Sequence, residues 1–208
     1  MATTTPNYGW AVPTSTDLVK DGATAIETLG DAIDASMNTA LGTKKAGMVL
    51  LNTTSFSGVA SVSLPASTFT STYTNYRILF QNLLASGSAN PTLRLRAAGS
   101  DNSTSNYDSE TIYAQSTAAY GNGVTNGSSF PLGVGATQRM ILSLDVFNPQ
   151  TADDTYISGI CYMTTNDSGN YISFGGRFDG STSFDSATFI AGGANVITGQ
   201  VQVYGYAK

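Results

Sequence analysis

Residues 140–147 read MILSLDVF, a stretch in which Met140, Leu142, Leu144 and Val146 alternate with Ile141, Ser143, Asp145 and Phe147. Successive side chains of a β-strand point to opposite faces, so this alternation predicts a strand with one face turned toward a core. Residues 92–97 (TLRLRA) and 200–206 (QVQVYGY) repeat the pattern. The three stretches together predict a sheet that buries one of its faces.

Further strand candidates lie between turn-forming Gly, Asn, Ser and Asp residues, over 47–53, 58–64, 74–83, 109–115, 155–164, 170–177 and 186–191. Short stretches of period two that are broken by turns are typical of two packed antiparallel sheets. We therefore expect residues 46–208 to form a mainly β head domain, an antiparallel β-sandwich of jelly-roll type. The glycine-rich segment 121–127 (GNGVTNG) has no nucleotide-binding spacing and no helix after it, so we expect a loop there.

The side chains between the apolar strand positions are mostly Ser, Thr, Gln and Tyr, with very little Lys. Strand edges that carry few charges invite pairing with another chain. We therefore expect sister subunits to cover part of the surface of the head.

Composition excludes several classes of function. Charged residues make up 11% of the chain, against about a quarter in an average domain. The chain has no histidine, so Ser–His–Asp and Cys–His catalytic sites are excluded. A net charge of −5 disfavours a nucleic-acid partner, which requires clustered Lys and Arg. Cys161 is the only cysteine and lies in an apolar stretch, so we expect a buried thiol without a disulfide partner.

Acidic residues offer the remaining route to site chemistry. Asp108 and Glu110 lie two positions apart and would share one face of a strand. We interpret them first as solvated surface residues and next as contacts to a glycan, with calcium binding and catalysis as weaker alternatives. The sequence predicts no enzyme, no cofactor and no metal site.

Two further zones precede the head. Residues 1–14 show no helical or strand period and are expected to form an extended arm, with Tyr8, Trp10 and Pro13 as anchors on another protein. Residues 1–14 would in that case attach the chain to another protein. The alternative is that Trp10 folds back onto its own domain.

Residues 15–42 predict a helix, with a cap in Ser15–Asp17, an end at Gly42, and Lys44 and Lys45 beyond it. Apolar residues recur at heptad spacing along it, at Val19, Ile26, Leu29 and Ile33. This spacing favours a short coiled-coil stalk, with an amphipathic cover on the β domain as the alternative.

The sequence also resembles a known family. Residues 8–23 (YGWAVPTSTDLVKDGA) and 29–34 (LGDAID) resemble the opening of many tailed-bacteriophage fibre and minor tail proteins. Residues 73–78 (YTNYRI) and 199–205 (GQVQVYG) resemble the β heads that end such proteins. The resemblance implies a homotrimeric virion fibre that attaches by its N-terminal arm and presents its β head to cell-surface glycan.

On that basis we expect a bacteriophage structural fibre for host attachment. Its glycan contacts are expected in distal loops, at Tyr107, Asp108, Tyr113, Tyr120 and Phe130. A capsid head fibre or decoration protein without a receptor role is the first alternative, and a polysaccharide depolymerase the second.

The start of the chain lacks the parts of a signal peptide, and no stretch is long and apolar enough for a membrane span. We therefore expect assembly in the bacterial cytoplasm and a final location in the virion, without membrane insertion. The sequence leaves open whether the chain is mounted on the head, the collar or the tail of the virion. It also leaves open whether the chain forms a trimer or a dimer.

Overall fold

The computed structural model describes residues 3–14, 18–41, 47–133, 139–165, 168–193 and 195–207. The chain divides into two compact units, residues 1–46 and residues 47–208. Each unit has its own secondary structure and its own packing.

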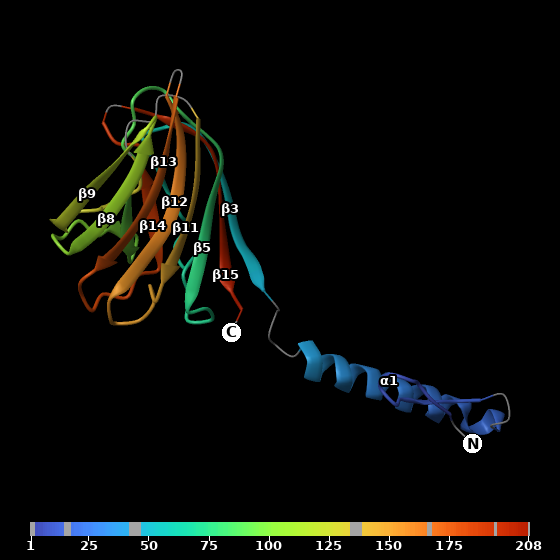
Figure 1. The fold of residues 1–208 in the computed structure, drawn as a ribbon. Helices are drawn as coiled ribbons and strands as arrows, with labels where there is room; N and C mark the ends of the chain where they lie inside the picture. Colours follow the sequence, from blue (N-terminus) through green and yellow to red (C-terminus); the bar gives the residue numbers. More distant parts are fainter. Residues whose placement is uncertain are drawn as a thin grey trace. The chain divides into compact units, whose positions relative to one another are not determined.

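The first unit combines a short hairpin with a helix (Figure 1). Strands β1 (Thr3–Thr4) and β2 (Ala11–Val12) pair antiparallel, and the backbone N–H of Thr5 donates to the carbonyl oxygen of Trp10 at 2.9 Å. Gly9 takes a φ of +67°, a conformation that glycine adopts without steric cost because it has no Cβ. The prediction of an extended arm is therefore wrong, because local hydrogen bonds fold this segment back on itself.

Helix α1 spans Val19–Leu41, close to the predicted helix. The expected N-terminal cap in residues 15–17 and the residues expected at its end, 42–45, lie outside the described residues. One face of the helix is half-buried at a spacing of three to four residues, at Gly22, Ala25, Leu29, Ala32, Ile33 and Ser36. The indole Nε1–H of Trp10 donates to Ser36 Oγ at 2.9 Å, so the hairpin contacts this face. Trp10 therefore folds back within its own unit.

The heptad positions are thus divided between two environments. Leu29 and Ile33 are half-buried, whereas Val19 is 97% exposed and Ile26 is 65% exposed. The coiled-coil stalk remains a prediction, because a single helix does not form one.

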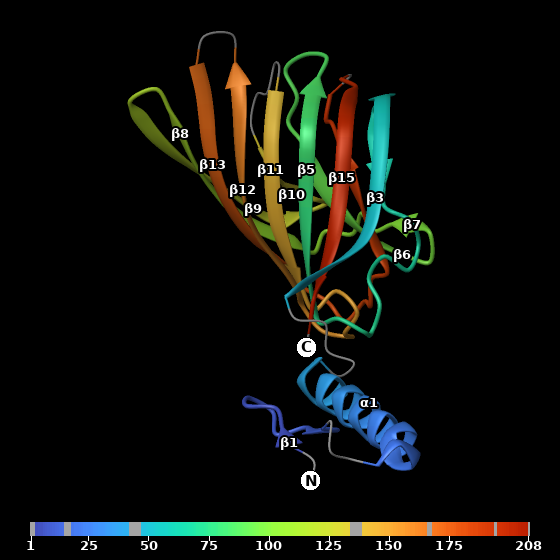
Figure 2. The ribbon, with the colours of Figure 1, turned by 90° about the vertical axis from the view of Figure 1, so that its right-hand side faces the viewer.

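The second unit is mainly β, and its sheets are antiparallel, which confirms the predicted fold class at that level. The larger sheet runs in the order β3 (Met48–Val59), β15 (Ile197–Tyr206), β5 (Asn75–Ala85), β11 (Arg139–Phe147), β12 (Thr155–Thr165), β13 (Ser168–Phe178), β8 (Tyr107–Gln115) and β9 (Ala118–Gly127). The smaller sheet runs in the order β10 (Phe130–Pro131), β6 (Thr92–Ala97), β14 (Ser186–Ile190) and β4 (Ser61–Ser63), with β7 (Ser100–Asp101) paired to β6. Figure 2 shows the larger sheet broadside, from β8 to β3.

The core lies between the inner faces of the two sheets. The rings of Phe80 on β5 and Phe189 on β14 lie 4.4 Å apart, centroid to centroid. Tyr107 is fully buried, and its hydroxyl accepts from the Leu95 N–H and donates to the Asn102 carbonyl. Cys161 is buried as expected, and burial raises the pKa of its thiol to about 12. Apolar contacts, with few charges, hold the sheets together.

One segment departs from the prediction. Residues 121–127 belong to edge strand β9, which pairs with β8 through Tyr113 and Tyr120 in register. The prediction of a loop there is wrong. Gly and Asn have low strand propensity, and the alternation of an edge strand that packs little of its surface is weak. Hydrogen bonding to β8 supplies the pairing that the local sequence does not indicate.

Candidate functional site

The outer face of the larger sheet, turned away from the smaller sheet, presents every second residue of its strands. One row across this face reads Gln202, Leu79, Ser143, Ile160, Ser173 and Ile112, from β15 to β8. The next row toward the end where β5 begins reads Tyr204, Arg77, Asp145, Ser158, Gly175 and Glu110. The face is therefore apolar in its centre and charged toward one end.

The charged end contains a group that we call the Arg177 cluster: Arg177, Asp108, Asp154 and Asp179. Arg177 Nη2 lies 3.2 Å from Asp108 Oδ2 and 3.2 Å from Asp179 Oδ2, and Nη1 lies 3.5 Å from Asp154 Oδ2. The register places Arg177 on β13 directly opposite Asp108 on β8. The guanidinium of Arg177 therefore forms ion pairs with three carboxylates.

Hydrogen bonds and nearby charges shift the pKa values of two members of this cluster, Asp108 and Arg177. The backbone N–H of Asn126 donates to Asp108 Oδ1 at 2.9 Å, and this bond, followed by the bond from Arg177, lowers the pKa of Asp108 below its usual value. The bond to Asp108 and the charges of Asp179 and Asp154 raise the pKa of Arg177. Asp108 is thus held ionised, as a hydrogen-bond acceptor, and is a poor proton donor at neutral pH.

A hollow of about 560 Å³ lies beside the cluster on the outer face. Asp108, Glu110, Tyr156 and Arg177 contribute side chains to its lining. Gly175 sits in the same row as Ser158 and Glu110 and adds no side chain there. The Tyr156 hydroxyl donates to Asp154 Oδ2 at 3.2 Å, which orients the ring. The hollow is lined by carboxylates, a guanidinium and an aromatic ring, and Gly175 leaves space between them. These are groups that bind sugar hydroxyls and stack on sugar faces.

The five residues predicted as glycan contacts do not form one site. Tyr107 and Phe130 are fully buried, with ring centroids 4.8 Å apart, so their predicted place in exposed loops is wrong. Tyr113 and Tyr120 stack with centroids 5.1 Å apart, and Tyr113 packs against the core, so this pair lies on the inner side of the sheet. Asp108 alone of the five lines the hollow.

Sequence reasoning missed the partners of Asp108. Asp154, Tyr156, Arg177 and Asp179 were not singled out in the sequence. The signal available was Arg177 itself, an arginine within a predicted strand of a head that has few charges. The cluster forms through strand register between segments about 70 positions apart, and no local pattern encodes that register.

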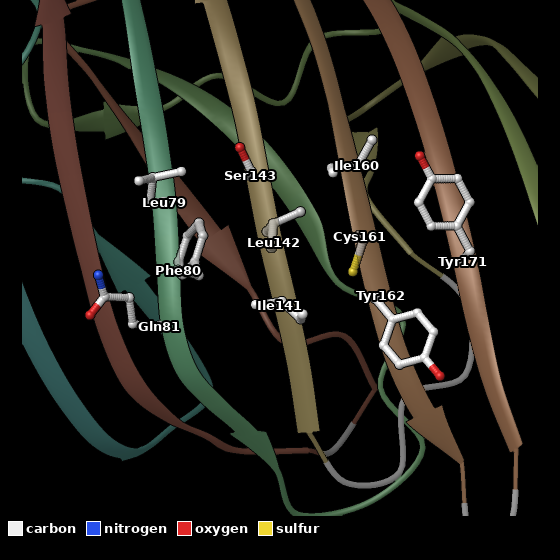
Figure 3. Close-up of a pocket in the computed structure, with 10 residues that line it drawn as sticks. All are labelled: Leu79, Phe80, Gln81, Ile141, Leu142, Ser143, Ile160, Cys161, Tyr162 and Tyr171. Atoms are coloured by element: carbon white, nitrogen blue, oxygen red, sulfur yellow. The ribbon is translucent and has the colours of Figure 1, made fainter. Parts of the chain in front are cut away.

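A second hollow, of about 310 Å³, lies in the apolar centre of the outer face. Leu79, Ile141, Ile160, Tyr162 and Tyr171 contribute outward side chains to it, from β5, β11, β12 and β13 (Figure 3). Its apolar lining distinguishes it from the hollow beside Arg177.

Within the described part of the chain, no group of three or more His, Cys, Asp or Glu residues is placed to hold a metal ion. Among the same residues, no helix is both long enough and apolar enough to cross a membrane. No known protein family, curated protein or solved structure matches the chain.

Proposed function

We propose that this protein is a structural fibre protein of a bacteriophage virion, which attaches through residues 1–46 and displays a β-sandwich head of jelly-roll type for recognition of host-surface glycan. We also propose that it works as a homotrimer. The observation that carries the proposal is the division into a small helical unit with exposed apolar side chains and a β unit with its own core. The N-terminal resemblance to phage fibre and minor tail proteins supports the same assignment.

The first unit has the surface of an attachment element. Tyr8 is mostly exposed and stacks on Trp10, with centroids 5.0 Å apart and an interplanar angle of 15°. On α1, Val19 and Ile26 are exposed one heptad apart. Exposed aromatic and aliphatic side chains are the usual anchors of protein–protein contacts. This surface supports a mount on another virion protein, on a stalk partner, or on both.

The head has a surface suited to glycan at the Arg177 cluster. Asp108 and Glu110 accept hydrogen bonds from sugar hydroxyls, and the exposed ring of Tyr156 offers a stacking face. The pairing of Arg177 with three carboxylates leaves this guanidinium little freedom to bind an anionic group. We therefore expect a neutral or basic sugar rather than an acidic one.

Binding of the full-length chain to host cells and to a glycan array tests the receptor role. We expect binding that falls at least tenfold, or about 1.4 kcal/mol, in Tyr156→Ala. Tyr120→Ala, on the other side of the sheet, should keep full binding. Absence of binding to any host cell by a folded wild-type chain would contradict the receptor role.

The alternative is a capsid head fibre or decoration protein that has no receptor. The shortness of α1 favours it, since 23 residues span only about 35 Å. The two functions separate cleanly, because a decoration protein would be found on particles and yet bind no host cell. A depolymerase is disfavoured by the absence of histidine and the scarcity of carboxylates in the sequence, and measured turnover of host polysaccharide, lost in Asp108→Asn, would be needed to support it.

A further inference from the structure

We infer that copies of this chain associate through the outer face of the eight-stranded sheet, with the apolar hollow at its centre as the core of the contact. This inference stands on the head alone and holds whether or not the protein belongs to a virion. Its starting point is the exposure of large apolar side chains in the middle of a sheet. Ile141 is 63% exposed and Ile160 is 46% exposed.

The apolar side chains lie in two neighbouring rows, and Ser143 and Ser173 separate those of the first row. Ile160 lies opposite Ser143 on one side and Ser173 on the other, and the row continues to Leu79 and Ile112. In the next row Tyr162 on β12 lies opposite Ile141 on β11 and Tyr171 on β13. Monomeric proteins rarely expose a contiguous apolar patch of this extent, and such patches mark interaction surfaces.

The size of the face fits a stable protein contact. Strands lie about 4.8 Å apart and side chains on one face recur about every 6.8 Å, so the six strands from β3 to β13, with four outward residues each, cover roughly 800 Å². This area leaves out the row of Tyr156, Arg177 and Asp108 that lines the hollow proposed for glycan. A standard interface buries about 800 Å² on each partner. The side of the hollow toward β15 is polar, because Gln81 Nε2 donates to Gln202 Oε1 there at 2.9 Å. An apolar centre inside a polar rim is the usual anatomy of an interface.

The charge of the face favours a second copy over an oppositely charged partner. Within the contact area the strands place three charged residues, Arg77, Arg139 and Asp145. The contact area therefore carries only +1, although the whole chain carries −5. Arg77 Nη1 lies 3.7 Å from Asp145 Oδ2, and the Tyr206 hydroxyl donates to Asp145 Oδ1 at 2.6 Å, so these charges are paired within the chain. Two such areas meet with little repulsion, and each offers the other an apolar surface.

Nitration of tyrosine in the full-length chain tests the inference without any substitution. Three tyrosines have nearly equal exposure in one chain, Tyr162 at 43%, Tyr171 at 49% and Tyr120 at 47%, and only the first two lie on the outer face. With tetranitromethane, followed by peptide mass spectrometry, we expect Tyr162 and Tyr171 to react at least about fivefold more slowly than Tyr120, because an interface core excludes solvent. Sedimentation of the same sample should show more than one copy per particle.

A charged variant adds a second readout. Ile160→Lys should abolish the protection of Tyr162 and Tyr171, whereas Val196→Lys, outside the sheet, should leave it unchanged; far-UV circular dichroism checks that both fold. If Ile160→Lys does not fold, the nitration ratio in the wild type still decides. Equal nitration of all three tyrosines overturns the inference, even in an oligomer, because the copies would then meet elsewhere. A monomer whose Tyr162 and Tyr171 become protected only on addition of detergent overturns it too, since the face would then bind apolar ligands.

Discussion

Arg177 on β13 lies directly opposite Asp108 on β8, and its Nη2 lies 3.2 Å from Asp108 Oδ2. The same guanidinium also reaches Asp154 and Asp179, from the two loops beside it. Because three carboxylates share one cation, the ionisation of Asp108 is linked to the folding of this end of the sheet.

This linkage predicts an acid-dependent loss of stability. The pKa of Asp108 in the folded chain lies below its ordinary value of 3.8, so the contribution of Asp108 is fully present above that value. It is lost as the pH falls through the folded pKa. Thermal unfolding followed by circular dichroism should show a fall in Tm below about pH 4 that is smaller in Asp108→Asn. An identical slope in both proteins would contradict the link.

Burial of Tyr107 predicts the opposite behaviour in alkali. Burial raises the pKa of Tyr107 from 10.0 to about 12, so its stabilising contribution is complete below pH 10 and is lost as the pH rises toward 12. At about 1.4 kcal/mol per pH unit, ionisation at high pH would lower the free energy of unfolding by up to about 3 kcal/mol.

Tyr107→Phe supplies the control for this titration. It should be less stable at neutral pH, by about 1–3 kcal/mol, because the Leu95 N–H and the Asn102 carbonyl lose their partner. Its stability should also vary less between pH 10 and 12. Urea unfolding at a series of pH values measures both effects, and an unchanged alkaline slope in the variant would assign that slope to other groups.

Two buried threonines should respond in opposite ways to the same substitution. Thr111 Oγ1 has no hydrogen-bond partner among the described residues, whereas Thr188 Oγ1 donates to Asp101 Oδ1 at 2.6 Å and accepts from Arg96 at 2.9 Å. Thr111→Val should stabilise the head by about 1 kcal/mol, because it removes a buried hydroxyl that lacks a partner. Thr188→Val should destabilise it by about 1–3 kcal/mol. Chemical denaturation distinguishes the signs, and destabilisation by Thr111→Val would show that its hydroxyl is bonded.

The exposed heptad position Ile26 gives a test of the stalk. If copies pack along this side of α1, Ile26→Asp places a charge in an apolar seam and should weaken their association at least tenfold. Lys20→Asp, at an exposed position of α1 that is not among the predicted heptad residues, is the matched control and should change association little. Sedimentation equilibrium measures the association of both variants. Equal association of the two variants would contradict the predicted coiled-coil stalk.

The strands could be predicted because their burial follows the alternation of the sequence. Leu142 and Leu144 are in the core, as the period of residues 140–147 requires. Strand β9 could not be predicted, because an edge strand of Gly and Asn depends on its partner and carries little pattern of its own. The N-terminal hairpin escaped prediction for a similar reason, since two-residue strands have no measurable period.

The candidate site shows where one sequence stops being informative. Tyr107 and Asp108 are adjacent, and both were expected at the same glycan surface. On a strand, adjacent side chains point to opposite faces, so Tyr107 enters the core while Asp108 reaches the outer face. Which of two neighbours is exposed depends on the face that the second sheet covers. That choice is made by tertiary packing.

Immunogold labelling of purified phage particles, with an antibody against residues 47–208, shows whether the chain is a component of the virion. We expect gold at a constant position on intact particles. Quantitative mass spectrometry of the same sample should show the chain in stoichiometric amounts. Particles carrying Trp10→Ala should retain less label, since Trp10 holds the hairpin to α1 through Ser36. Complete, infectious particles that lack the chain while it accumulates free in the lysate would contradict the account.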